Sequence, residues 1–504
     1  MTGEMPLPTR LAGAIWGHLV GDAVGVPYEF RPAADIGEVR FGASGTHHQP
    51  PGTWSDDGAL MLALLDSLLT VGFDVEDQGR RAVDWYRRSA YTPDGSRFDI
   101  GNATRSALDA IDRGRPAAEA GGTDEGANGN GSLMRILPLA LVQRQVRDAR
   151  LIDEAHAASR VTHGTEPAQV TCALYSLIVR ALLHGRIGLP EVLADARRHL
   201  RAVYASTPTG APKLAALDRI EAHRDRAGRG SVWDSFWSAW DAFAGAAGYR
   251  ETIERAVAYG NDTDTTAAIA GGLAGLRWGI DGIPADWLAG MRGRQVVDPL
   301  VDRLIATDGW RTSTSNPLRV DWVNLALVPA LAAAPGRLGM TLLPGKHQAD
   351  GAAGKHWRNL EEDAQRLREV DRADTFVLLV EDAELLACGV PDFVEVLAGH
   401  DIAVLREPIP DGDIPPDLSA FRTTLDTLSA RLAAGETIVV ACRGGLGRTG
   451  TLVACLLENA GLEAEDAIAL THASRPKTIE TSRQKRFVRD WPRSSSGDPG
   501  SAGA

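Results

Sequence analysis

The sequence predicts a multidomain protein in which an all-α bundle is followed by an α/β domain with a central, mostly parallel sheet. Up to residue 278, apolar residues recur at the three- and four-residue spacing that is typical of helices. No persuasive alternating run occurs before Thr312. After residue 345, β-branched apolar runs alternate with helical segments, an order that favours a parallel sheet. The 504 residues are enough for two or three domains.

The helical spacing assigns residues 1–315 to the first domain. The stretches that carry it most clearly are Leu60–Leu69, Val170–Leu183, Val192–Tyr204, Val232–Phe243 and Thr266–Trp278. The composition then shifts, and we expect residues 316–345 to form a junction.

The α/β pattern assigns residues 346–492 to the second domain. Its expected strands are Thr375–Glu381, Ile402–Leu405 and Thr437–Val440, and its expected helices are Leu360–Val370, Val390–Leu397 and Leu418–Ala434. The tail, residues 493–504, is rich in serine, glycine and proline, and we expect it to be disordered.

Composition and charge limit the partners and the compartment. A net charge of -13 argues against a broad nucleic-acid-binding surface or an anionic membrane surface. The four cysteines fit a reducing compartment and not a disulfide framework. The N-terminal residues show no signal-peptide pattern, and no apolar run is long enough to span a bilayer. We therefore expect a cytoplasmic protein with no membrane partner.

A cysteine lies in a glycine-rich loop between the last expected strand and an apolar helix. Backbone N–H groups and the helix dipole in such a loop bind anions and favour a thiolate. Five residues separate Cys442 from Arg448, so the guanidinium can bind a phosphoryl group above the sulfur, and Thr449 can donate its hydroxyl to the sulfur. This pattern predicts a cysteine-dependent phosphatase that needs no metal or other cofactor.

Such a phosphatase needs an acid for the leaving alkoxide and a base for water. The stretch 406–415 follows the expected strand Ile402–Leu405, so it reaches the same sheet edge as the cysteine loop. Asp411, between Pro410 and Gly412, is the better candidate, and Asp413 competes with it.

In the helical domain, acidic residues gather where loops enter helices. Asp56 and Asp57 follow Ser55, and Asp262 and Asp264 precede Thr265. One helix cap needs only one such side chain, and the alternative interpretation as simple caps leaves the others unexplained. Several hard oxygens together indicate a divalent cation such as Mg²⁺, Mn²⁺ or Ca²⁺.

Residues 11–278 resemble the ADP-ribosylglycohydrolase (dinitrogenase-reductase-activating glycohydrolase) family. The resemblance runs in order through GDAVGVPYE, SDDGAL, FDIGNATRSAL, NGNGSLMRILPLAL, THG and GNDTDTTAAIAGGLAGLRWG. It implies an all-α fold with two Mg²⁺ or Mn²⁺ ions. Two departures stand out: Ser55 replaces the usual threonine, and Asn261 replaces a usual glycine.

The resemblance also implies roles for individual residues. The metal ligands would be Ser55, Asp56, Asp57, Asp262, Asp264 and Thr265. Glu29 and Asp99 match catalytic carboxylates. The residues expected to hold the ADP-ribose are Asn128, Gly129, Asn130, Gly131, Ser132, Met134 and His163, although a buried structural histidine is an equal reading of His163.

The region 340–490 resembles the dual-specificity phosphatase superfamily, most closely the cyclin-dependent-kinase-associated phosphatases. The resemblance implies Cys442 as nucleophile, Arg448 as phosphate ligand, Thr449 as the aid to sulfur release and Asp411 as acid and base. The phosphate would lie in the loop Arg443, Gly444, Gly445, Leu446 and Gly447. Ala441 stands where the family usually has histidine, a change that we expect to raise the thiol pKa somewhat.

Together these patterns predict a bifunctional hydrolase for ADP-ribosylated and phosphorylated substrates, either proteins or small molecules. One activity would be metal-dependent cleavage at C1″ of ADP-ribose, and the other would be phosphate-ester hydrolysis through a phosphocysteine. The alternative is a sensor that binds ADP-ribose or phosphate with one or both sites catalytically silent.

Overall fold

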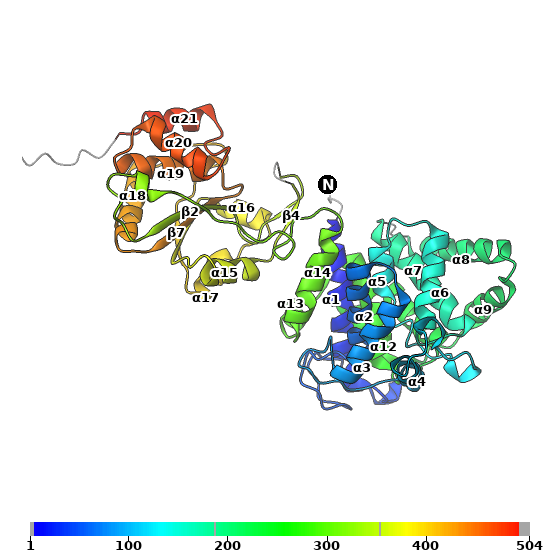
Figure 1. Ribbon diagram of the computed structural model, residues 1–504. Helices are drawn as coiled ribbons and strands as arrows, with labels where there is room; N and C mark the ends of the chain where they lie inside the picture. Colours follow the sequence, from blue (N-terminus) through cyan, green and yellow to red (C-terminus); the bar gives the residue numbers. More distant parts are fainter. Residues whose placement is uncertain (1–4, 186–187, 352–353, 493–504) are drawn as a thin grey trace, which may run out of the picture. The chain divides into compact units, whose positions relative to one another are not determined.

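The computed structural model in Figure 1 describes residues 5–185, 188–351 and 354–492. The tail 493–504, which we expect to be disordered, lies outside these residues. The chain divides into two compact units, Met1–Thr307 and Asp308–Ala504. No helix in the described ranges combines the length and the hydrophobicity that crossing a bilayer requires.

The first unit is built of helices, as the spacing of its apolar residues predicts. All five stretches with the clearest helical spacing lie in helices, namely α2, α7, α8, α10 and α12. The elements in chain order are α1 (Leu7–Gly25), η1 (Val26–Tyr28), η2 (Ala33–Asp35), α2 (Asp56–Val71), α3 (Val75–Arg88), α4 (Asn102–Asp112), η3 (Ala117–Glu119), η4 (Glu125–Ala127), α5 (Leu137–Val142), α6 (Asp148–Arg160), α7 (Glu166–Leu183), α8 (Leu189–Ser206), α9 (Ala211–Ala222), α10 (Val232–Ala244), α11 (Tyr249–Ala258), α12 (Thr263–Trp278), η5 (Ile280–Gly282), α13 (Ala285–Ala289) and α14 (Arg294–Ala306).

Helices α1 and α12 meet along a glycine seam in the middle of this unit. Four glycines of α1, four residues apart, face backbone atoms of α12, and a Cβ atom on any of them would lie 2.2–2.5 Å from those atoms. The two helices run antiparallel, so the end of α1 lies beside the start of α12. Only glycine permits so close an approach. The facing pairs are Gly13 with Gly275, Gly17 with Gly271, Gly21 with Ala267 and Gly25 with Asp264.

The second unit contains a five-stranded sheet in the order β1-β2-β7-β5-β6. Strands β2, β7, β5 and β6 are parallel to one another, and β1 pairs antiparallel with β2. Helices α15 and α17 lie on one side of the sheet and α18–α21 on the other (Figure 1). The elements are β1 (Asp321–Trp322), η6 (Leu325–Leu327), β2 (Arg337–Leu342), β3 (His347–Gln348), β4 (His356–Trp357), α15 (Leu360–Glu369), β5 (Thr375–Leu378), α16 (Asp382–Ala387), α17 (Phe393–Gly399), β6 (Ala403–Arg406), α18 (Leu418–Ala433), β7 (Thr437–Cys442), α19 (Gly447–Asn459), α20 (Ala464–Ser474) and α21 (Ser482–Arg489).

The fold class that the sequence predicts, a helical region followed by an α/β domain with a mostly parallel sheet, is confirmed. The segment 316–345, which we expected to be a junction, contains β1 and β2 of this sheet. Gly339 interrupts the apolar pattern of β2, and packing against side chains from an earlier segment requires a glycine there. A Cβ atom at this position would lie 2.3 Å from Val320 and 3.0 Å from Trp322.

Strand β7 is the central strand, and all six of its residues are buried. Parallel strands carry ligand sites at their C-terminal edge. Cys442 ends β7 at this edge, where it pairs in register with Leu342 of β2. The fold therefore places the cysteine loop where a ligand of an α/β domain is expected.

Candidate functional site

The acidic residues of the first unit come together at one end of the glycine seam. Ser55 caps the N-terminus of α2 and accepts the Asp57 N–H at 3.2 Å, and Asp262 is the N-cap position of α12. The two groups meet where the Thr265 hydroxyl donates to Asp57 Oδ2 at 3.1 Å. The six residues that the sequence predicts as metal ligands thus lie at two adjoining helix N-termini.

Two oxygens of this group are buried without a hydrogen-bond partner among the described residues, namely Asp57 Oδ1 and Asp264 Oδ2. Oxygens of Glu29, Asp262 and Asp264 also lie within 4.8 Å of one another. Buried polar atoms are normally satisfied, so unpartnered carboxylate oxygens need an explanation. A divalent cation with hard oxygen ligands is one that fits these donors.

The electrostatics of the cluster also favour a bound cation. Burial, followed by the charges of neighbouring carboxylates, raises the pKa of Asp56, Asp57 and Asp264 well above the ordinary value. Burial and the nearby Asp99 raise the pKa of Glu29 to about 10. A cation-free cluster therefore holds protons at neutral pH, and bound cations would replace them.

Asp22 is a member of this region that the sequence did not single out as a site residue. It lies fully buried in α1, and its carboxylate accepts the N–H groups of Ser55 at 2.9 Å and Gly58 at 2.8 Å. Burial raises its pKa to about 7. Asp22 therefore fixes the first turn of α2, which carries Asp56 and Asp57. A buried aspartate within an apolar helix was the available signal.

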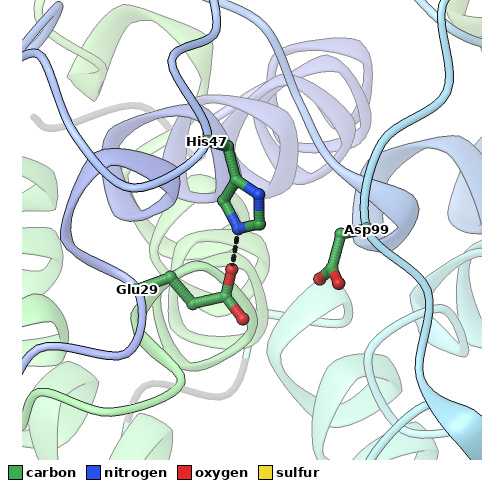
Figure 2. A group of neighbouring side chains, drawn as sticks. All are labelled: Glu29, His47 and Asp99. Atoms are coloured by element: carbon green, nitrogen blue, oxygen red, sulfur yellow. Dashed lines mark hydrogen bonds and ion pairs between the residues drawn. The ribbon is translucent and has the colours of Figure 1, made fainter.

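Glu29 follows η1 and bonds His47 through Oε2 and Nε2, with Asp99 facing the pair from another loop (Figure 2). The His47 ring also lies 5.8 Å from the Phe30 ring and 5.2 Å from the Phe98 ring, centroid to centroid. His47 is therefore a residue of this site that no sequence pattern marks. Its partner is 18 residues away, at no spacing that a local pattern would reveal.

A cavity of about 430 Å³ opens over these carboxylates. Glu29, Asp56, Asp99, Asp262 and Thr265 line one part of it. The other part is formed by Phe30, Ile100–Thr104, Gly126, Gly129, Asn130, Gly131, Met134, His163 and Gly230. Its size and its mixture of glycine backbone, apolar and acidic groups suit a small polar ligand.

Some of the residues that the sequence predicts to hold ADP-ribose line this cavity, and others do not. Asn130 lines the cavity and also donates to Asp262 Oδ2 at 2.7 Å. His163 packs against Gly131, where a Cβ would lie 2.7 Å from the ring, and burial and Arg135 lower its pKa to about 3. Asn128 and Ser132 are buried in other contacts, with Glu125 and Ser159 respectively, and do not line the cavity.

Ser55, Asp57 and Asp264 also do not line the cavity wall, and all three are buried next to the carboxylates that do. Asn261, the departure from glycine, has a φ of 60°, in the left-handed region that asparagine tolerates better than most residues. Its side chain donates to the Ala227 carbonyl at 2.7 Å. Asn261 therefore stabilises the turn that precedes Asp262.

In the second unit, the cysteine loop joins β7 to α19. Cys442, Arg448 and Thr449 are all buried, and the Cys442 N–H donates to the Thr449 hydroxyl oxygen at 2.8 Å. Gly445 has a φ of 69°, and a Cβ there would lie 2.0 Å from the Thr341 carbonyl oxygen. The loop therefore requires glycine at this position because the neighbouring strand leaves no room.

Arg448 is held from two directions. Its two terminal nitrogens bond both oxygens of Glu384, at 2.6 and 2.9 Å, and Nη2 also lies 2.9 Å from Asp411 Oδ1. Asp413, the competing candidate for the acid, pairs instead with Arg483 at 2.7 Å. The structure thus brings Asp411 to the loop, and it adds Glu384 as an orienting group that the sequence analysis missed.

Other residues hold the backbone of the loop. The Arg443 carbonyl accepts a hydrogen bond from Lys346 Nζ at 3.1 Å, and the Gly444 carbonyl accepts one from Arg475 at 3.3 Å. The Gly447 N–H donates to Glu480 at 2.9 Å, and the Leu446 carbonyl accepts the N–H of Gly450 at 2.8 Å. No local sequence signal marks Lys346 or Glu480, because both reach the loop from distant segments.

Comparisons with known proteins match each unit separately. A family model described as ADP-ribosylglycohydrolase matches residues 4–313, and one described as Cyclin-dependent kinase inhibitor 3 (CDKN3) matches residues 310–470. The chain is 32% identical over 305 residues to ADP-ribosylarginine hydrolase Tri1 of Pseudomonas putida (strain GB-1), a match that covers 60% of this chain and 80% of the relative.

Two solved structures are also similar. A structure described as ADP-ribosylglycohydrolase-related protein complex is 33% identical, with a TM-score of 0.50, and the match covers 59% of this chain and 97% of that one. A crystal structure of kinase associated phosphatase is 24% identical, with a TM-score of 0.31, covering 34% of this chain and 93% of that one.

Proposed function

The chain belongs to the ADP-ribosylglycohydrolase family, and from that premise we propose that its first domain releases ADP-ribose from an acceptor with the help of divalent cations. The carrying observation is the acidic cavity, next to which buried carboxylate oxygens of Asp57 and Asp264 lack a hydrogen-bond partner among the described residues. The second domain is a CDKN3-like phosphatase domain, so the chain is an enzyme with two hydrolase domains.

The donor set fits Mg²⁺ or Mn²⁺. Carboxylates and hydroxyls supply only hard oxygens, and two of these oxygens, on Asp57 and Asp264, are buried and unpaired. The ligands would be Ser55, Asp56, Asp57, Asp262, Asp264 and Thr265. Bound cations would supply Lewis-acid stabilisation of negative charge on the ribose hydroxyls and on a water molecule.

Glu29 and Asp99 are the groups that would move protons. Glu29 and Asp99 both line the cavity, and Glu29 lies beside Asp262 and Asp264 of the candidate cation site. In its protonated form, Glu29 would protonate the leaving group as the bond to C1″ breaks through an oxocarbenium-like state. Water then adds to C1″ and passes its proton to a carboxylate. His47 and the two neighbouring phenylalanines keep Glu29 in place.

We propose arginine as the acceptor, because the relative described above is an ADP-ribosylarginine hydrolase. The cavity mouth supports this choice. Phe30 lines the cavity and is 65% exposed, and it lies next to the carboxylates of Glu29 and Asp99. An aromatic face beside negative charge is suited to a planar guanidinium cation.

In the second domain, we propose hydrolysis of phosphate esters through a phosphocysteine. Cys442 would attack phosphorus, Arg448 and the loop N–H groups would bind the phosphoryl oxygens, and Asp411 would protonate the leaving oxygen. Thr449 would assist departure of the sulfur when water attacks the phosphocysteine. The carrying observation is the position of Asp411 on the buried Arg448, which Glu384 orients.

The test uses the full chain with two variants that serve as controls for each other, Asp56→Ala and Cys442→Ser. ADP-ribose release from arginine-linked and serine-linked ADP-ribosyl peptides is measured by chromatography, with and without EDTA. Phosphate release from an aryl phosphate is measured on the same samples. We expect Asp56→Ala and EDTA to abolish only the first activity, and Cys442→Ser to abolish only the second.

Each part of the proposal has its own refutation. ADP-ribose release that survives both EDTA and Asp56→Ala would rule out the cation-dependent mechanism. Faster cleavage of the serine-linked peptide would rule out arginine as the preferred acceptor. Phosphate release that is unchanged in Cys442→Ser would exclude the phosphocysteine, and its absence from wild type would favour a phosphate-binding sensor.

A further inference from the structure

The charges around the phosphate loop do not favour a thiolate if Arg448 is the only cation considered. Its guanidinium bonds the carboxylates of both Glu384 and Asp411, so two negative charges face one positive charge. The carboxylate of Glu480 accepts a hydrogen bond from the Gly447 N–H and adds a third negative charge. Deprotonating Cys442 would place another negative charge in the same region. A further cation close to the loop would therefore add to the effect of the loop N–H groups and the helix dipole in favouring a thiolate.

Lys346 is the buried cation next to this loop. It is 3% exposed and follows the turn that leads from β2 to β3. Its ammonium donates to the Arg443 carbonyl at 3.1 Å and to Gln348 Oε1 at 3.2 Å. Both partners are uncharged, so the positive charge is not cancelled by its own hydrogen bonds. The Arg443 carbonyl belongs to the residue directly after Cys442.

The position of Lys346 is fixed by a buried ion pair. Arg358 and Asp363 are each 1% exposed and share two hydrogen bonds of 2.7 Å, and Asp363 also accepts the Gly345 N–H at 2.9 Å. Burial lowers the pKa of Lys346 to about 8, an effect that negative charge on the neighbouring sulfurs of Cys388 and Cys442 opposes. The ammonium is therefore still mostly charged at neutral pH.

We propose that Lys346 is a positioning residue of the phosphate loop, which holds the Arg443 carbonyl and supplies the positive potential that favours a thiolate at Cys442. The proposal rests on the phosphatase function proposed above. Lys346 would also supply the positive charge that residue 441 does not, because the residue directly before the cysteine is an alanine.

Other titratable groups face the cysteine from each neighbouring element. Hydrogen bonds from Arg448 keep the pKa of Glu384 low although burial opposes them, and burial raises the pKa of the Cys388 thiol. Neither group should therefore change its charge between about pH 5 and pH 8. Further charged groups near the loop include Arg443 with Asp350, Arg475 with Asp321, and also Asp411 and Glu480.

The test measures the titration of Cys442 directly in the full chain. Iodoacetamide alkylation rates are followed against pH, and the Cys442 peptide is quantified by mass spectrometry. The variants are Lys346→Gln, which removes the charge and keeps a hydrogen-bond donor, and Lys346→Arg, which keeps the charge. Lys355→Gln is the matched control, because its ammonium is half-exposed and pairs with Asp308.

We expect Lys346→Gln to raise the alkylation midpoint by about one pH unit or more, the size of effect that a nearby opposite charge produces. Lys346→Arg and Lys355→Gln should keep the wild-type midpoint. Equal midpoints in wild type and Lys346→Gln would overturn the proposal, as would the same rise in Lys355→Gln. If Lys346→Gln does not fold, as judged by circular dichroism, a raised midpoint in folded Lys346→Arg overturns it.

This readout separates the inference from the phosphatase function. If wild type releases no phosphate but the midpoint depends on the charge at position 346, the inference holds and the phosphatase proposal fails. If wild type is an active phosphatase and all midpoints agree, the inference fails alone.

Discussion

Replacing Asp264 by asparagine should stabilise the first unit without cations, and bound cations should reduce this advantage. Asp264 lies in the first turn of α12, is 1% exposed, and has one oxygen without a hydrogen-bond partner. Burial, then the charges of Glu29, Asp57 and Asp262, raise its pKa well above the ordinary value. In the folded, cation-free protein Asp264 near neutral pH either repels its neighbours as a carboxylate or retains a proton, and both states cost stability.

The magnitude follows from the spacing of the charges. Oxygens of Glu29, Asp262 and Asp264 lie within 4.8 Å of one another. At an effective dielectric constant of about 20, two unit charges at that distance repel by about 3.5 kcal/mol. Removing one charge should therefore stabilise the cation-free unit by up to about 3 kcal/mol for each ionised neighbour. The introduced amide can donate to the adjacent carboxylates.

The sign of the pH dependence is fixed by the raised pKa. Below about pH 4 both the folded and the unfolded state hold the Asp264 proton, so the group does not affect stability. As the pH rises, the unfolded state loses the proton first, and the wild-type unit loses stability. The advantage of Asp264→Asn should therefore be large near pH 8 and vanish toward pH 4.

The assay is thermal unfolding followed by circular dichroism in EDTA and in excess Mg²⁺, with Asp281→Asn, an exposed position, as the control. In EDTA near pH 8 the variant should melt several degrees above wild type, at about 2 °C per kcal/mol. In Mg²⁺ the difference in stability should shrink by about 2.7 kcal/mol, because ligand binding at about 100 times Kd adds that free energy only to wild type. A variant that melts below wild type in EDTA would refute this reasoning.

Three further predictions concern the second unit. Asp411→Asn should lower kcat for phosphate release by about 100-fold or more, whereas Asp413→Asn should leave it near wild type, and equal losses would remove the assignment of the acid. Glu384→Gln should lower kcat/KM by about 10- to 100-fold through loss of a charge-assisted pair, measured by steady-state kinetics with circular dichroism as the folding check. Asp363→Asn should destabilise the unit by about 3–5 kcal/mol in thermal unfolding because it leaves a buried guanidinium without its counter-charge, and a loss below about 1 kcal/mol would contradict this.

The parts of the fold that a sequence can predict are those with a sustained local pattern. The helices α7, α10 and α12 keep the three- and four-residue spacing along their length, and β7 is a continuous β-branched run. Strand β2 was not predicted because Gly339 breaks its apolar pattern. The side chains of Val320 and Trp322 lie so close to this position that only glycine fits there. Propensity cannot show such a contact.

The candidate sites follow the same division. Cys442, Arg448 and Thr449 stand in one stretch, so their spacing alone carries the chemistry. Glu384 and Lys346 reach the loop from 64 and 97 residues away, counted from their hydrogen-bonded partners, and only the folded chain brings them there. Residues that react are often local in sequence, whereas those that orient them come from the tertiary structure.

The glycine seam has a consequence for how the ion preference of the candidate metal site could change. One set of candidate ligands stands at the start of α12, which backbone contacts from Gly13 to Gly25 hold against α1. The other set stands at the start of α2, whose first turn is held by Asp22 of α1. No side chain separates α1 from α12 along the seam, so the smallest substitution there inserts a whole methyl group. Adaptation to a larger or smaller ion is therefore confined to the loops at the helix starts. A mutational library aimed at new ion selectivity should leave the seam intact and vary the residues around Ser55 and Asn261.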